Sequence, residues 1–165
     1  MKWLKENLQE NTVFLNLAHC KMSVEEVKEL ATALLNDKIF KTIDLSGNKF
    51  SDLGVQMLVI ALQTNTQVDT IILDACGISD LGGKMLLAML HHNNTLVHLS
   101  LKDNPIDPTL TKKITSFLEH NKLLQEKSVA PKRRVVPHYQ NQRALLPQPA
   151  IKKESNRKRV HFNMN

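Results

Sequence analysis

Four residues at a constant spacing are the first candidates for chemistry in this chain of 165 residues. They are Cys20, Asn48, Cys76 and Asn104, and each follows the one before it by 28 residues. Thiols ligate metals, but neither cysteine belongs to a Cys-x-x-Cys pair, and two cysteines are too few for a disulfide framework. Amides and thiols also hydrogen-bond peptide groups where a chain turns sharply. We therefore expect these four side chains to have a structural role.

The other chemically active side chains do not form a catalytic set. Asp44, Asp74 and Asp103 occupy related positions, but no His or Ser falls where it could complete a triad with them. His91–His92 is expected near a helix end, where the helix dipole stabilises a cation. Gly82–Gly83 opens a predicted helix and is not part of a phosphate-binding loop. The sequence predicts no enzyme, no metal site and no cofactor.

The elements that position these residues repeat with the same spacing. Pairs of alternating apolar residues precede the four positions: Leu15-x-Leu17, Ile43-x-Leu45, Ile71-x-Leu73 and Leu99-x-Leu101. Alternation at period two predicts short strands with one buried face. Each strand and the segment that follows it form a unit too small to bury its own apolar face, so consecutive units must stack.

Helices are predicted between the strands. Apolar residues recur there at three- and four-residue spacing: Val24, Val27, Leu30, Ala31 and Leu34, then Leu58, Ala61 and Leu62, then Leu86, Met89 and Leu90. Ser23, Ser51 and Ser79 are the predicted N-caps, and Glu26 is placed to complete a capping box with Ser23.

The whole pattern, L-x-x-L-x-L-x-x-N/C-x-L over about residues 12–120, resembles the leucine-rich-repeat family. The repeat length is similar to that of the ribonuclease-inhibitor-like class. The resemblance implies an α/β solenoid in the form of a short horseshoe, with parallel strands on the concave side and helices on the convex side.

The domain organisation follows from where this pattern begins and fails. We expect an N-terminal capping helix at residues 1–11, about four repeats with a degenerate C-terminal cap at 12–125, and a disordered basic tail at 126–165. In the cap, Val129 keeps the repeat spacing while Lys127 replaces a core leucine. This combination predicts a failing fifth strand that blunts the sheet edge.

The resemblance implies a binding face formed by the side chains beside the strand leucines. The spacing places them in three rows: Phe14, Thr42, Thr70 and His98; Asn16, Asp44, Ile72 and Ser100; Ala18, Ser46, Asp74 and Lys102. Phe14 and Ile72 are apolar within a polar surround, which suits contact with another protein. Isolated exposed apolar residues are also normal on any protein surface.

Charge is divided sharply along the chain. Residues 1–125 contain 12 Lys and Arg against 14 Asp and Glu, whereas residues 126–165 contain 10 against 2. The basic residues of the tail that could direct nuclear import or hold nucleic acid are Lys132, Arg133, Arg134, Arg157, Lys158 and Arg159. Few aromatic residues accompany them, which disfavours base stacking.

The end of the tail reads Arg159-Val160-His161-Phe162. It resembles the R/K-V-x-F motif by which regulators dock on protein phosphatase 1. The resemblance implies strand addition, with Val160 and Phe162 on one apolar side.

Protein binding is the function that these observations favour. We expect a monomeric, non-enzymatic interaction module or adaptor whose partner binds the concave face. Protein phosphatase 1 docking through Arg159, Val160 and Phe162 is one alternative, and a basic tether to nucleic acid or the nucleus is another. The sequence shows no signal peptide or membrane span, so an intracellular location, cytoplasmic or nuclear, is expected. A eukaryotic adaptor, a bacterial protein delivered into host cells and a fragment of a longer array remain open.

Overall fold

Four strands alternate with four helices in the part of the chain that the structure describes. The computed structural model describes residues 13–35 and 39–129. In chain order the elements are β1 (Phe14–Asn16), α2 (Val24–Leu34), β2 (Thr42–Asp44), α3 (Ser51–Leu62), β3 (Thr70–Ile72), α4 (Asp80–Leu90), β4 (His98–Ser100) and α5 (Pro108–Val129).

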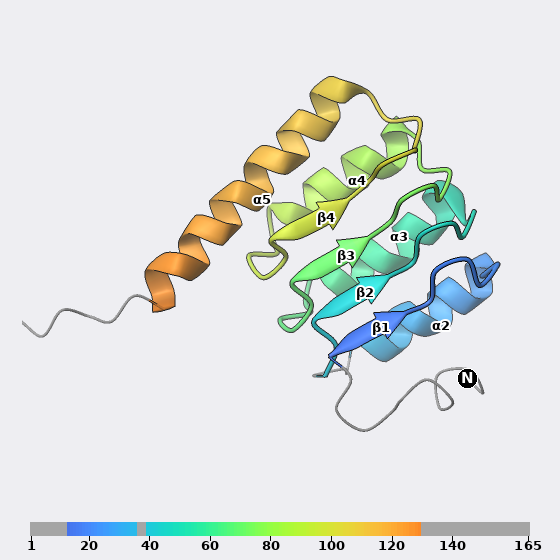
Figure 1. The fold of residues 1–165 in the computed structure, drawn as a ribbon, viewed down its shortest axis with the longest axis horizontal. Helices are drawn as coiled ribbons and strands as arrows, with labels where there is room; N and C mark the ends of the chain where they lie inside the picture. The colour runs from blue at the N-terminus through green and yellow to red at the C-terminus, as the bar shows by residue number, and fades with distance from the viewer. Residues whose placement is uncertain (1–12, 36–38, 130–165) are drawn as a thin grey trace, which may run out of the picture. The chain divides into compact units, whose positions relative to one another are not determined.

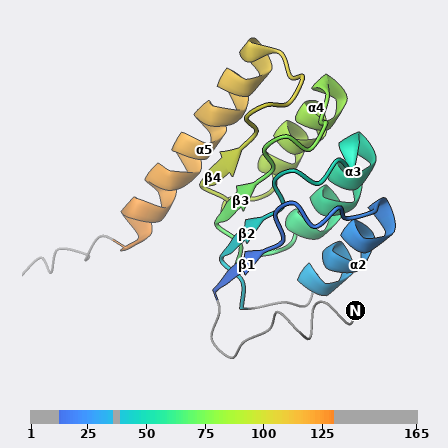
Figure 2. The same ribbon diagram turned by 45° about the vertical axis from the view of Figure 1, so that its right-hand side comes forward.

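The strands form one parallel sheet in the order β1-β2-β3-β4 (Figure 1). The register aligns Leu15, Ile43, Ile71 and Leu99, which are the residues that the 28-residue spacing aligns in the sequence. Helices α2, α3 and α4 lie side by side against one face of this sheet (Figure 2). The predicted α/β solenoid of parallel strands with helices on one side is confirmed.

The core lies between the sheet and the helices. On the sheet side it contains Leu15, Ile43 and Ile71 in the strands and Leu17, Leu45 and Leu73 just after them, all at most 4 % exposed. The predicted helix residues are also buried, apart from Val24, which is half-buried. Leu99 in β4 and Leu101 just after it are only half-buried, because no described strand lies beyond them.

Two of the three predicted N-caps are present. The capping box of α2 is complete: the Ser23 hydroxyl accepts from the Glu26 N–H at 3.2 Å, and the Glu26 carboxylate accepts from the Ser23 N–H at 2.8 Å. Ser79 caps α4 by accepting from the Leu81 N–H. The prediction for Ser51 is wrong, because Ser51 has a φ of +58° and the residue before α3 is Phe50, which makes no side-chain cap. An N-cap serine needs an extended backbone instead.

The predicted fifth strand is also wrong. α5 continues to Val129, so Lys127 lies on a helix, and the expected boundary at residue 125 falls inside that helix. Every residue from Lys122 to Lys127 is a good helix former. A buried anchor holds this helix where the strand pattern would begin: Asn121 donates to the Asn93 and Leu96 carbonyls at 2.8 and 2.9 Å.

The remaining predictions on domain organisation fall on residues that the structure does not describe. These are the N-terminal capping helix at residues 1–11 and the tail beyond Val129, with its basic residues and docking motif. None of the described helices is long and apolar enough to cross a membrane.

Candidate partner-binding face

The open face of the sheet collects the side chains predicted to bind a partner. The register aligns Phe14, Thr42, Thr70 and His98 in one row, and Asn16, Asp44, Ile72 and Ser100 in the next. Asp74 and Lys102 lie just past the ends of β3 and β4, where the Asp74 carboxylate accepts from the Lys102 N–H at 2.9 Å. The ten residues therefore share one surface, and their role in binding remains a prediction.

Exposure varies across this surface. Phe14 is 48 % exposed, and Asn16, His98 and Lys102 are exposed as well. The residues on the two central strands are half-buried by their neighbours. Phe14 at one side and Ile72 near the centre are the apolar side chains that a partner would cover.

Two carboxylates at the centre of the face are held in fixed positions. Asp44 accepts from the Ser46 N–H at 2.9 Å and from the Ser46 hydroxyl at 2.6 Å. Asp74 accepts from the Ser100 hydroxyl at 2.6 Å, in addition to the Lys102 N–H. In each residue these bonds use Oδ1, so the carboxylate orientation is set before any partner arrives. A cationic group of a partner would therefore meet a preorganised acidic centre.

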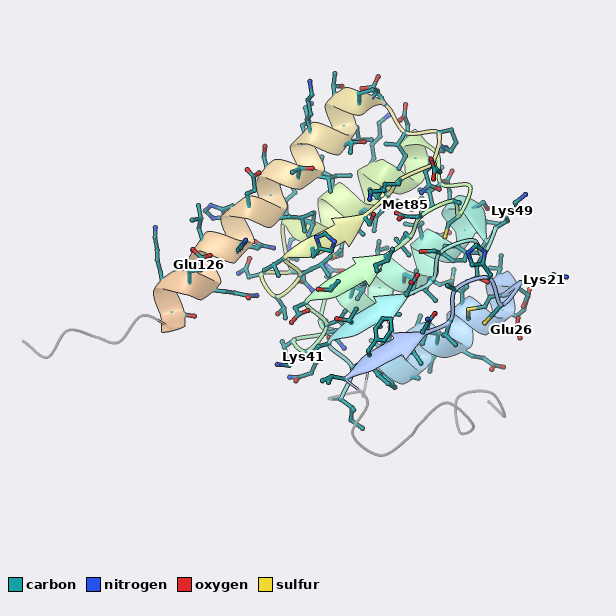
Figure 3. The ribbon with its side chains drawn as sticks, in the orientation of Figure 1. Lys21, Glu26, Lys41, Lys49, Met85 and Glu126 are labelled. Carbon is teal, nitrogen blue, oxygen red and sulfur yellow. The ribbon has the colours of Figure 1, made fainter. Side chains whose placement is uncertain are left out.

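A cleft at the carboxyl ends of β1 and β2 has the opposite charge. It measures about 530 Å³ and is lined by His19, Lys21, Met22, Gly47 and Lys49. Figure 3 shows Lys21 and Lys49 close together there, whereas Lys41 lies at the other ends of the strands. The sequence reasoning missed this cleft because its residues come from the loops of two different repeats. The surface around the sheet is therefore acidic at its centre and basic at one end.

The row of Asn48 and Asn104 makes the backbone hydrogen bonds expected of it. Asn48 is fully buried, donates to the Leu17 and Leu45 carbonyls at 2.7 and 2.9 Å, and accepts from the Met22 N–H at 3.0 Å. Asn104 donates to the Leu73 carbonyl at 2.7 Å. Each asparagine thus joins its own turn to the repeat before it.

The two cysteines of this row differ from each other. The thiol of Cys76 is buried and donates to the Leu45 carbonyl at 3.2 Å, and burial raises its pKa to about 11. Cys20 is exposed, and its thiol donates to the Ala18 carbonyl at 3.6 Å. Both are free, so Cys76 completes the internal row while Cys20 lies at its solvent-exposed end.

A second row of buried asparagines was missed in the sequence. Asn65, Asn93 and Asn121 are spaced by 28 residues and are at most 6 % exposed. Asn65 donates to the Leu34 carbonyl and Asn93 to the Leu62 carbonyl, so each again binds the preceding repeat. Their identical spacing was the available signal. It was overlooked because these residues lie outside the strands: Asn65 and Asn93 follow α3 and α4, and Asn121 lies within α5.

Two aspartates of the described residues, Asp52 and Asp107, have a lowered pKa. Among the described residues, no group of three or more His, Cys, Asp and Glu side chains could hold a metal ion. Partial burial opposes the ionisation of Asp52, but hydrogen bonds from the Ser79 hydroxyl and from the Ser79 and Gly82 amides outweigh it and lower the pKa. The hydroxyl and amide of Thr109 lower the pKa of Asp107. The Asp52 carboxylate joins α3 to the start of the next helix, whereas the Asp107 carboxylate bonds within the turn that begins α5.

Comparisons with known proteins agree with this architecture. The sequence profile described as Leucine Rich repeat matches residues 40–59 and 92–109. A solved structure described as "Leiomodin-1 Actin-Binding Site 2 (ABS2)" superposes with a TM-score of 0.61 and 17 % identity, covering 87 % of this chain and 94 % of that one. The chain therefore has the leucine-rich-repeat fold that its spacing predicts.

A tropomodulin C-terminal domain from Caenorhabditis elegans also matches, with a TM-score of 0.48 and 13 % identity over 79 % of this chain and 96 % of that one. A comparison with curated protein sequences finds no match.

Proposed function

We propose that this chain is a non-enzymatic interaction module that binds a protein on the open face of its sheet. The observation that carries the proposal is the centre of that face: half-buried Ile72 lies in register with Asp44, and the Asp74 carboxylate is fixed beside the same strand end. An apolar contact with adjacent preorganised charges is a common form of a protein-binding surface. A partner segment complementary to this surface has a Lys or Arg next to an apolar side chain.

Variants of the face test this proposal directly. Proximity labelling in cells would identify partners, and calorimetry with purified proteins would then measure affinity. Ile72→Lys and the double variant Asp44→Asn/Asp74→Asn are expected to weaken binding at least about tenfold, which is about 1.4 kcal/mol. Glu25→Gln, on the exposed start of α2, is the matched control. Unchanged affinity in both face variants would refute the proposal.

Actin is one partner to test by name. The leiomodin domain is described as an actin-binding site, and the similarity to this chain is one of fold at 17 % identity. Co-sedimentation of the full chain with purified actin filaments, repeated with Ile72→Lys, decides whether actin binds through the sheet face.

The tail supports two further proposals on sequence alone. Protein phosphatase 1 docking through Arg159, Val160 and Phe162 predicts that Val160→Ala/Phe162→Ala abolishes phosphatase recovery in a pull-down. Tethering to nucleic acid predicts binding that weakens steeply with added salt. Imaging the chain with and without residues 126–165 would test the expected cytoplasmic and nuclear location.

A further inference from the structure

The outer edge of the last strand faces a groove. The groove measures about 480 Å³ and lies between β4 and α5, which run alongside each other in Figure 1. The chain from Val97 to Lys102 forms one wall, and residues of α5, among them Lys122, form the other. Leu99 and Leu101 are half-buried, whereas their counterparts in the first three repeats are core residues. The described residues therefore leave the apolar side of the last repeat partly exposed.

Two peptide donors of this edge have the orientation that strand pairing needs. In each earlier repeat, the N–H groups of two residues donate to carbonyls of the next repeat at 2.8–2.9 Å; the first residues are Leu17, Leu45 and Leu73, and the second are His19, Gly47 and Ala75. Leu101 and Asp103 hold these positions in the fourth repeat, and no described residue accepts from their N–H groups. A strand edge with unpaired donors is a template for pairing with another chain.

A peptide acceptor completes the pattern. The carbonyls of Val13, Lys41 and Asp69 each accept two N–H groups from the start of the next strand, at 2.8–3.1 Å. Val97 holds this position in the fourth repeat. The acceptor at Val97 and the donors at Leu101 and Asp103 together define the register in which a further parallel strand would pair.

The apolar side chains of the groove determine which residues of such a strand would fit. In the register of the earlier strands, two alternate residues of an added strand lie beside Leu99 and Leu101 and point to the same side as these leucines. Leu118 of α5 lines the groove on that side. Both positions therefore suit large apolar residues, as they do in the earlier repeats, and the residues between them point to the open face.

The charge along the groove favours an acidic strand. Lys102 is exposed at the carboxyl end of the edge, and Lys122 is exposed on the wall that α5 forms. Glu119 lies on the same wall, so the lining has two lysines against one acidic residue. Opposite charges on neighbouring strands stabilise their pairing. An Asp or Glu therefore fits the open-face position beside Lys102.

We propose that the β4 edge binds an extended segment of another protein, with alternating apolar and acidic residues, as an added parallel strand. The apolar side chains of this segment pack against Leu99 and Leu101, and an acidic side chain lies beside Lys102. The Leu101 and Asp103 N–H groups donate to its carbonyls. Backbone pairing of this kind supplies affinity, and the alternating side chains supply specificity. The edge is a second site, distinct from the centre of the open face around Ile72 and Asp44.

A synthetic peptide with blocked ends and the sequence Ser-Thr-Ile-Asp-Leu-Asp-Ser is the probe. Its centre repeats the sequence Thr-Ile-Asp-Leu of residues 42–45 and the Leu-Asp of residues 73–74, which belong to strands that already pair in this register. The peptide Ser-Thr-Ile-Lys-Leu-Lys-Ser, with the charges reversed, is the matched control.

Amide hydrogen exchange of the full chain, followed residue by residue by NMR, tests the pairing. The Leu101 and Asp103 amides are expected to exchange at least about tenfold more slowly with saturating probe than without it. The Leu73 amide, bonded to Ser100, should not change. Unchanged Leu101 exchange up to the solubility limit of the probe overturns the proposal. So does a Leu101 amide that exchanges as slowly as that of Leu73 before any probe is added, because the edge is then already paired, by a second copy or by this chain itself.

A charge reversal tests the proposed chemistry of the partner. Lys102→Glu is expected to weaken binding of the acidic probe at least about fivefold and to make the lysine peptide the tighter ligand. Lys112→Glu makes the same change on the exposed side of α5, outside the groove lining, and should leave both affinities unaltered. An unchanged preference in Lys102→Glu overturns the proposal. Ile72→Lys, which tests the open face, should leave the protection of the Leu101 amide by the probe intact, so the two proposals can fail separately.

Discussion

Replacing Asn93 by alanine is expected to destabilise the repeats more than any surface substitution. Asn93 is 3 % exposed and makes four hydrogen bonds to backbone: it donates to the Leu62 and Asn65 carbonyls at 2.6 and 3.3 Å, and accepts from the Thr95 and Leu96 amides at 2.8 and 2.7 Å. A buried backbone group that loses its partner costs about 1–3 kcal/mol.

The expected loss of stability depends on how many of the four backbone groups bonded to Asn93 regain a hydrogen bond from water. If half of the four backbone groups find a partner in water, two stay unpaired, and Asn93→Ala lowers the free energy of unfolding by about 2–6 kcal/mol. Small domains have about 5–15 kcal/mol in total, so the melting temperature should fall by roughly 10 °C or more.

Urea unfolding followed by circular dichroism measures this change. The control is Asn94→Ala, because Asn94 is the exposed neighbour and no side-chain hydrogen bond of Asn94 is found in the described residues. We expect the control to stay within about 0.5 kcal/mol of the unaltered chain. If the two variants were equally stable, the buried asparagine row could not be what ties the repeats together.

Three further outcomes are expected. In the native chain, a thiol reagent at pH 8 should modify the exposed Cys20 rapidly. Cys76 should stay unmodified until the chain unfolds, because its thiol is buried and has a pKa of about 11. Mass spectrometry that counts the modified thiols checks this. Asp52 has a lowered pKa, so its stabilisation is present above the unfolded pKa of about 3.9 and is lost as the pH falls through the folded pKa; Asp52→Asn should flatten that acid limb of the stability curve. Gly47→Ala should cost about 1–2 kcal/mol because φ is +71°. It should cost more than Gly77→Ala at φ +73°, because a Cβ at residue 47 would overlap the His19 ring, whereas a Cβ at residue 77 meets nothing within 4 Å; equal melting temperatures for the two variants would contradict the contact.

The repeat architecture was predictable because its signal is redundant. Strand leucines, helix leucines and the Asn/Cys row all return after 28 residues, and each alone predicts the same stacking. The sheet register then follows, so the rows of the candidate face could be written down from the sequence. The identity of the partner could not be predicted, because the fold does not determine which side chains occupy the exposed positions of the face.

The errors came from positions where local geometry overrides the repeat. Ser51 matches Ser23 and Ser79 in spacing, yet its positive φ prevents it from capping α3. Lys127 was assigned by continuing the strand spacing, although the buried Asn121 and the helix-forming residues around it extend α5 instead. A repeat period predicts the position of an element only where the stacking of neighbouring repeats determines the conformation of the chain.

The asparagine rows also limit how this chain can change in length. Asn65, Asn93 and Asn121 each bind backbone one repeat earlier, so deleting or duplicating a whole unit of 28 residues would leave every such bond with an equivalent partner. Loss of a single residue between two of them would instead remove the match between amide and carbonyl at a buried turn. Viable length variants of the folded part should therefore differ by whole units.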